Sequence, residues 1–229
     1  PSGDSCQYIA DAAIQAMTSL QTIGTDQLSR KALLEFALNQ FETGEMPGAC
    51  PSDIYFNIPD YPLHWVKWLQ KHLLYTDDKD LMHQCLPALG HLMDYYNNLA
   101  LPEYKVLGGN LGELCFLDHE DIDRQGIVTG LNALYCRALH SAAWIFDYAN
   151  IPESANIVRN RAKHIAKTIR DLCWNEEKGL FSDCYINGAK SNSYTLHTNI
   201  LAMYGSLPNG KDYSRIFDNI FLEESPYFK

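Results

Sequence analysis

The sequence predicts an all-α protein made of consecutive helical hairpins. Apolar residues recur at a period close to 3.6 along almost the whole chain, which is the period of an amphipathic helix. Turn residues and acidic residues divide these stretches into pairs. Of the 229 residues, 46% are hydrophobic and 20% are charged, so the chain has enough apolar side chains for a large core.

The first two pairs of helices are predicted from their apolar stripes and turns. Stripes over residues 9–20 and 28–41 mark the first pair, with a glycine turn between them. The second pair follows a connection rich in Gly and Pro. An aromatic stripe over residues 65–75 marks its first helix, and Asp77-Asp78 forms an acidic cap for its second.

The second half of the chain repeats this pattern with one interruption. A helix over residues 127–148 is followed by another, which we expect Asn150 and Glu153 to open as a capping box. A run of strand character then ends at Asn187-Gly188, which predicts a small β-hairpin near residues 180–190. Two shorter helices follow, around residues 193–204 and 212–221.

This arrangement is the pattern of an (α/α)6 toroid, or barrel of helical hairpins. About eight helices in four pairs are predicted, whereas a closed barrel of six hairpins needs about twelve, so the barrel is expected to be incomplete. We expect residues 1–229 to form a single domain of this kind, truncated at both ends. Such a piece would leave apolar helix faces exposed, so we expect it to associate with itself or with the remaining helices of the barrel.

Charge and cysteine content exclude several classes of protein. The 18 basic residues are outnumbered by 28 acidic ones, giving a net charge of −10, which repels nucleic acid. No apolar run approaches the roughly 20 residues that a membrane-spanning helix needs. An odd number of cysteines, 7, without close spacing argues against a disulfide framework. Unpaired cysteines favour the cytoplasm, but a large core needs no disulfides, so a periplasmic or secreted protein stays open.

Three loop-to-helix junctions carry candidate binding residues. In Ile58-Pro-Asp-Tyr-Pro-Leu-His-Trp65, the side chains of Asp60 and Trp65 either cap and pack the helix or form the wall of a pocket. Five acids crowd residues 113–123, and Asp118 among them is a candidate for contact with a ligand or for a structural role. His197 and Asn199 begin a later helix, where they either bind a ligand or cap and pack.

No metal or nucleotide site is predicted. Cys115/His119 and Cys136/His140 have spacings compatible with zinc, but a zinc site needs three or four ligands. The glycine-rich phosphate-binding motifs and the serine hydrolase motif are absent from the sequence.

With these residues in place, the chain resembles the catalytic six-hairpin domain of the bacterial α-L-rhamnosidases, a glycoside hydrolase family. Gly3-Asp4 resembles the end of an acidic segment of that family, and Ile58-Pro59-Asp60 resembles the start of one of its helices. Phe116-Leu117-Asp118-His119 resembles its Phe-Ile-Asp-Trp motif, although His119 stands where the family usually has Trp. The stretches Trp174–Asp183 and His197–Gly205 resemble its hairpin and the helix that follows.

The resemblance implies the hydrolysis of terminal α-L-rhamnosyl bonds by an inverting general acid/base mechanism that needs no cofactor. The substrate would be a rhamnose-containing glycoside or oligosaccharide. The resemblance implies that the general acid lies before Pro1 and the general base after Lys229, so the catalytic residues are not assigned. The expected sugar contacts are Asp4, Asp60, Trp65, Asp118, His119 and His197.

Two other functions remain open from the sequence. A helical-repeat scaffold that binds a protein partner would explain the helix pairs but not the acidic, Gly-rich loops. A different glycoside hydrolase with the same toroid would share the fold, since a fold does not determine function.

Overall fold

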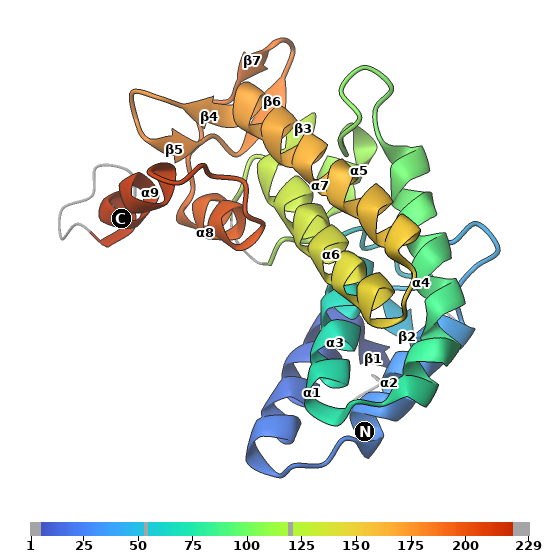
Figure 1. Ribbon diagram of the computed structural model, residues 1–229. Helices are drawn as coiled ribbons and strands as arrows, with labels where there is room; N and C mark the ends of the chain where they lie inside the picture. Colours follow the sequence, from blue (N-terminus) through green and yellow to red (C-terminus); the bar gives the residue numbers. More distant parts are fainter. Residues whose placement is uncertain (1–5, 53–54, 119–120, 222–229) are drawn as a thin grey trace. The chain divides into compact units, whose positions relative to one another are not determined.

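The computed structural model describes residues 6–52, 55–118 and 121–221, most of which are helical (Figure 1). The helices are α1 (Ile9–Thr22), α2 (Gln27–Leu38), α3 (Tyr61–Thr76), α4 (Lys79–Leu99), α5 (Asn110–Leu114), α6 (Thr129–Tyr148), α7 (Pro152–Cys173), α8 (Leu196–Tyr204) and α9 (Asp212–Phe221). The short strands are β1 (Gln7–Tyr8), β2 (Ala49–Cys50), β3 (Ile127–Val128), β4 (Trp174–Asn175), β5 (Leu180–Phe181), β6 (Cys184–Ile186) and β7 (Ala189–Lys190). The predicted succession of helical hairpins is confirmed. None of the described helices combines the length and the hydropathy that crossing a bilayer requires.

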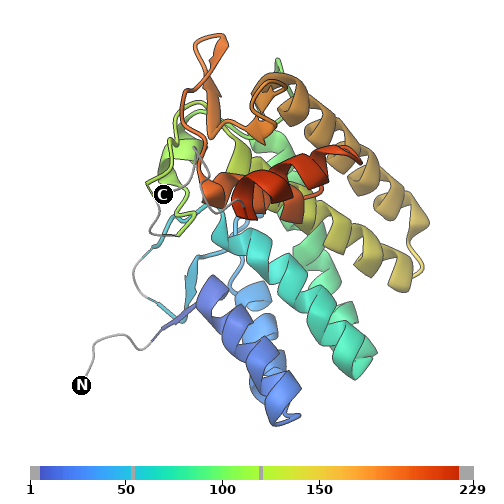
Figure 2. The ribbon, with the colours of Figure 1, turned by 90° about the vertical axis from the view of Figure 1, so that its left-hand side faces the viewer.

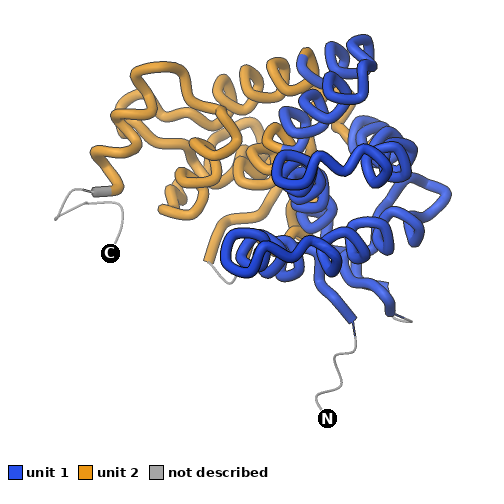
Figure 3. Tube along the Cα trace, turned by 60° about the horizontal axis from the view of Figure 1, so that its bottom comes forward, with its two compact units in different colours: residues 1–98, 138–159 blue, residues 99–137, 160–229 orange. Residues whose placement is uncertain are grey.

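The chain divides into two compact units (Figure 3). Unit 1 comprises Pro1–Asn98 and Ala138–Arg159, and unit 2 comprises Leu99–Arg137 and Asn160–Lys229. The helices α6 and α7 each contribute residues to both units. That the whole chain behaves as one domain stays a prediction.

In unit 1, α1 and α3 lie side by side and α2 packs against both (Figure 2). The two buried indole rings of α3 donate hydrogen bonds inside the core. Trp65 Nε1 donates to the Leu33 carbonyl oxygen at 3.1 Å, and Trp68 Nε1 donates to Ser29 Oγ at 2.9 Å. A buried Trp is stabilised when its polar edge finds such a partner. These contacts fix the relative position of α2 and α3.

Two junctions between helices show how local sequence sets helix ends. Asp77 has a left-handed φ of 54° and ends α3, and Asp78 Oδ1 accepts the Leu81 N–H at 2.8 Å, as predicted for the cap of α4. The capping box at Asn150 is wrong. Asn150 has a φ of 59°, and its N–H donates to the Asp147 carbonyl oxygen at 2.9 Å, so it ends α6 instead of opening α7.

Unit 2 contains the predicted β-hairpin. Strands β6 and β7 pair antiparallel around Asn187-Gly188, whose φ angles of 52° and 82° are those of a tight hairpin turn. Strand β3 pairs with β6 and completes a three-stranded sheet. The first residue of α6 is tied to this sheet, since Thr129 Oγ1 donates to the Ser182 carbonyl oxygen at 2.7 Å.

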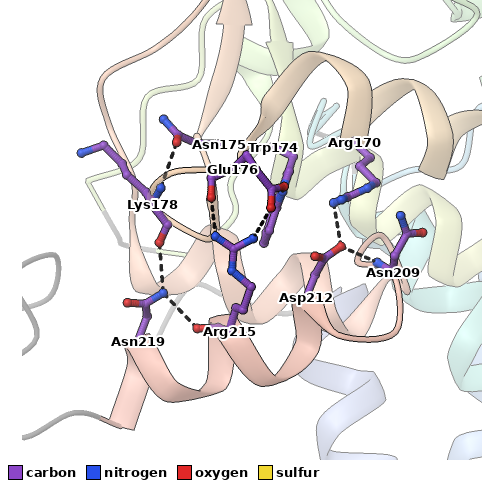
Figure 4. Close-up of polar contacts among 9 residues, drawn as sticks. All are labelled: Arg170, Trp174, Asn175, Glu176, Lys178, Asn209, Asp212, Arg215 and Asn219. Atoms are coloured by element: carbon purple, nitrogen blue, oxygen red, sulfur yellow. Dashed lines mark hydrogen bonds and ion pairs between the residues drawn. The ribbon is translucent and has the colours of Figure 1, made fainter.

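Helix α9 is joined to α7 and to the β4–β5 region by paired charges around one indole ring (Figure 4). Arg170 forms an ion pair with Asp212 at 2.7 Å, and Arg215 forms one with Glu176 at 2.6 Å. The guanidinium carbons of Arg170 and Arg215 lie 4.9 Å and 5.4 Å from the centre of the Trp174 ring. Because each cation has an acidic partner, this cluster holds α9 in place.

All seven cysteines fall within the described residues and are free thiols. Cys85, Cys136 and Cys173 are completely buried, which confirms their interpretation as small core residues. Burial raises the pKa of Cys85 to about 12 and that of Cys173 to about 11. These thiols are therefore protonated and unreactive in the folded protein.

Candidate functional site

The predicted binding residues lie where long connections lead into helices. Asp60 directly precedes α3, Asp118 lies in the connection before α6, and His197 is the second residue of α8. Asp60 belongs to unit 1, whereas Asp118 and His197 belong to unit 2. The two other expected contacts, Asp4 and His119, lie outside the described residues and stay predictions from the resemblance.

In unit 1 the candidate residues are buried. Trp65 is 0% exposed, and its indole N–H donates to the Leu33 carbonyl oxygen. Its ring therefore has no exposed face that a sugar could contact. The expectation that Trp65 contacts a sugar is corrected, and the packing interpretation holds for this residue. Asp60 is 2% exposed and occupies the N-cap position of α3, although its side chain accepts no capping hydrogen bond from that helix. Its position is the one that the capping interpretation expects.

Unit 1 has a groove between α1 and α3 that is lined by His64, four residues after Asp60. It has a volume of about 240 Å³, and its polar lining includes His64, Lys67 and Lys71. Burial lowers the pKa of His64, and the charge of Asp60 opposes this shift without reversing it. No carboxylate lines the groove, so it lacks the acidic acceptors and proton donors that glycoside chemistry requires.

In unit 2, Asp118 is exposed on a strained turn. Leu117 and Asp118 are consecutive non-glycine residues with positive φ, at 44° and 64°. Left-handed conformations of this kind cost free energy for residues with a side chain, and they persist where surrounding contacts hold them. One such contact is visible, because an Arg124 guanidinium nitrogen donates to the Asp118 carbonyl oxygen at 3.2 Å. In this backbone conformation Leu117 is buried, at 3% exposed, and Asp118 lies at the surface.

A glycine in α6 brings this turn next to α8. A β-carbon on Gly130 would lie 3.1 Å from Leu201 Cδ1 and 3.2 Å from Leu117 Cδ1, so both leucines pack on the same spot of the first turn of α6. Leu117 directly precedes Asp118, and Leu201 lies one helical turn beyond His197 on the same face of α8. Asp118 and His197 are therefore carried by neighbouring elements of unit 2.

At the N-terminus of α8, His197 is partly exposed whereas Asn199 is buried. Thr195 caps the helix, since its Oγ1 accepts the Thr198 N–H at 3.2 Å. His197 is half-buried, and no described residue forms a hydrogen bond with its imidazole. Asn199 is 0% exposed and exchanges hydrogen bonds of 2.8 Å and 3.0 Å with the backbone of Phe181. Of this pair, only His197 is available to a ligand.

The sequence reasoning missed one residue of this region, Asp183. It is 0% exposed and accepts hydrogen bonds from the loop that leads into α8. The available signal was a single acid inside the apolar, strand-like run Gly179–Ile186, where a charged residue needs several partners.

The described residues contain no group of three or more His, Cys, Asp and Glu side chains arranged to hold a metal ion. Cys136, one of the residues with zinc-like spacing, is fully buried, and its thiol lies 3.6 Å from the Ala162 carbonyl oxygen. Burial raises the pKa of this thiol well above its ordinary range, so the thiolate that zinc requires is disfavoured.

Comparisons with known proteins agree with this fold. The family model described as Trehalase matches residues 122–222, which include β3, α6–α9 and the hairpin. A search of curated proteins finds no match. The GH78 family rhamnosidase of Bacillus sp. GL1 superposes on all of this chain with a TM-score of 0.90 at 23% sequence identity. A rhamnosidase of Klebsiella oxytoca with rhamnose bound matches 99% of the chain with a TM-score of 0.83 at 17% identity.

A third solved structure, the neutral trehalase of Saccharomyces cerevisiae, covers 95% of the chain with a TM-score of 0.68 at 14% identity. The chain spans 24% of the Bacillus protein, 43% of the Klebsiella protein and 54% of the yeast protein. The fold is therefore that of the helical-hairpin glycosidases. The resemblance to the α-L-rhamnosidases noted in the sequence is confirmed at the level of this fold.

Proposed function

We propose that this chain forms part of the catalytic barrel of a glycoside hydrolase that releases terminal α-L-rhamnosyl groups. One observation carries the proposal: Asp118, an exposed carboxylate on a strained turn, lies beside the helix that carries His197, whose imidazole forms no hydrogen bond with a described residue. Solved proteins with the same fold are named as rhamnosidases, one of them with rhamnose bound.

The chemistry divides between binding and bond cleavage. In inverting hydrolysis one carboxylic acid protonates the leaving oxygen while a carboxylate about 6.5–9.5 Å away activates water. We assign neither catalytic carboxylate to a described residue. The role proposed here is to hold the sugar: Asp118 accepts hydrogen bonds from sugar hydroxyls, and His197 donates to or accepts from another hydroxyl. The expected contacts Asp4, Asp60 and His119 rest on the resemblance alone and form no part of this pair.

Calorimetry with free monosaccharides tests this proposal. We expect L-rhamnose to bind more tightly than D-glucose, and Asp118→Asn and His197→Ala each to weaken rhamnose binding about tenfold, the effect of losing one charged or well-placed hydrogen bond. The matched control is Asp121→Asn, an exposed acid of the same connection, which should leave the affinity unchanged. Equal binding of both sugars, or rhamnose affinity that does not respond to Asp118→Asn, contradicts the proposal.

The match to the Trehalase family model supports a second candidate, a hydrolase with the same fold that acts on a different sugar. Trehalose as the titrant separates the two candidates. Binding of trehalose in preference to L-rhamnose, lost in Asp118→Asn, would favour the second. Indifference of every sugar to Asp118 and His197 would instead favour a helical scaffold that binds a protein.

A further inference from the structure

Asp183 is a buried carboxylate that forms no ion pair with a described residue. It lies between β5 and β6 in unit 2 and is 0% exposed. No Lys or Arg in the described part of the chain lies within ion-pair distance of it, in contrast to the buried Asp212, which pairs with Arg170. A buried charge is strongly disfavoured unless hydrogen bonds replace its water. The donors that surround Asp183 therefore take the place of that water.

Those donors come from two different loops. Oδ1 accepts the backbone N–H of Thr195 at 3.0 Å and its hydroxyl at 2.9 Å. Oδ2 accepts the hydroxyl of Ser193 at 2.6 Å and the backbone N–H of Asp123 at 3.4 Å. Oδ1 thus accepts hydrogen bonds from Thr195, which caps α8. Oδ2 also accepts one from Asp123, at the end of the acid-rich segment 113–123, which we call the acidic connection.

Both loops carry a candidate sugar contact. Thr195 is the N-cap of α8 and lies two residues before His197, while Asp123 lies five residues after Asp118 in the same connection. The backbone of Asp183 adds to the junction, because its carbonyl oxygen accepts the N–H of Thr129 at 2.9 Å at the start of α6. A single side chain and its peptide group therefore join the segments that position both contacts.

We infer that Asp183 is a positioning residue that locks the acidic connection and the N-terminus of α8 together, and so sets the spacing of Asp118 and His197 around a bound sugar. This inference rests on the proposed function for the identity of the ligand. The joining of the two loops stands on the hydrogen bonds alone. Asp183 itself is buried and does not touch the substrate.

Substitution of Asp183 by Asn distinguishes its hydrogen bonds to Thr195 from its hydrogen bond to Asp123. In Asp183→Asn the amide oxygen can still accept from Thr195, and the amide NH2 can donate to Ser193 Oγ, but it cannot accept from Asp123. We therefore expect faster amide hydrogen exchange at Asp123 with Thr195 protected as before. In Asp183→Ala both amides should exchange faster. The interior of α7 should keep its protection in both variants.

The same variants are titrated with L-rhamnose, using the full 229-residue chain. We expect Asp183→Asn to weaken binding about tenfold, the equivalent of one charge-assisted hydrogen bond, although the side chain is remote from the sugar. The matched control is Asp212→Asn, which removes another buried charge in unit 2. It should lower the melting temperature and leave rhamnose affinity and exchange at Thr195 and Asp123 unchanged.

The two readouts distinguish the possible failures. Unchanged exchange at Asp123 and Thr195 in both Asp183 variants, or an equal loss of protection throughout α7, would overturn the positioning role. Normal rhamnose affinity in Asp183→Asn despite faster exchange at Asp123 would overturn its link to sugar binding. If the unmodified chain does not bind L-rhamnose, the proposed function fails, and the exchange pattern alone decides whether Asp183 joins the loops.

Discussion

In both units the candidate residues lie at loop-to-helix junctions, but the two units differ in whether these residues are buried or exposed. In unit 1 the junction before α3 buries Asp60 and Trp65, and the indole N–H is used inside the core. In unit 2 the buried groups, Asp183 and Asn199, form hydrogen bonds within the protein, while Asp118 and His197 remain accessible. A polar and aromatic motif at a helix start therefore indicates a binding site only where the structure leaves its polar atoms at the surface.

The largest effect expected from this comparison is on stability and belongs to unit 1. Trp65→Ala should destabilise the protein by about 3–5 kcal/mol, because it leaves a cavity and removes the hydrogen bond to Leu33. Urea unfolding measures this. As a control, Tyr75→Ala, at a ring that is 53% exposed, should change stability by about 0.5 kcal/mol or less. A Trp65→Ala protein of normal stability that fails to bind rhamnose would return Trp65 to the site.

A second effect in unit 1 depends on pH. His72 is 0% exposed, with Nδ1 2.8 Å from Ser29 Oγ, and burial lowers its pKa although Asp26 and Asp78 oppose the shift and Arg30 adds to it. Because the folded state disfavours the protonated ring, the unfolded state binds more protons below the ordinary pKa of about 6.5. The free energy of unfolding should therefore fall as the pH drops below that value.

Urea titrations at pH 7.5 and pH 5.5 measure this loss, with His72→Gln as the matched variant. The variant should be less stable than the original protein at pH 7.5 and should lose less stability between the two pH values. An identical pH dependence in both proteins would show that the titrating group lies elsewhere.

A smaller stability change than that of Trp65→Ala is expected in unit 2, yet it should alter binding. In Gly130→Ala the helix gains about 1 kcal/mol from propensity and loses about 1–3 kcal/mol because the new methyl group presses on Leu117 and Leu201. The net change is a loss of up to about 2 kcal/mol, less than the loss expected for Trp65→Ala. Displacement of Leu117 moves Asp118, so rhamnose affinity should fall.

Gly90→Ala in α4 is the matched control, since nothing lies within 4 Å of its added β-carbon. It should stabilise the protein by about 0.5–1 kcal/mol without affecting the sugar. If both glycine variants bind rhamnose equally well, the packing of Leu117 does not position Asp118.

Most of the fold follows from local patterns in the sequence. Apolar periodicity locates the long helices, and Asn187-Gly188 locates the hairpin turn, because both signals depend on neighbouring residues alone. Asn150 shows the limit, since the same residue can end one helix or begin the next and the path of the chain decides between them.

The site can be predicted less completely from the sequence, because the exposure of a side chain depends on contacts with residues far away in the chain. Trp65 and Asn199 carry groups suited to a ligand, yet Leu33 and Phe181, which bond to them, lie 32 and 18 residues away in the sequence. The strain at Asp118 is likewise invisible in a sequence motif. What the sequence does indicate is the region, since acids and turn residues concentrate in the connection before α6.

The central claim is that the surface of unit 2 carrying Asp118 and His197 binds a rhamnosyl group. Titration of the isotope-labelled chain with L-rhamnose, followed by NMR, tests it most directly. We expect saturable shifts at the Asp118 amide and the His197 ring, with much smaller shifts for D-glucose and none at Trp65. Shifts confined to unit 1, or equal shifts with both sugars, would contradict it.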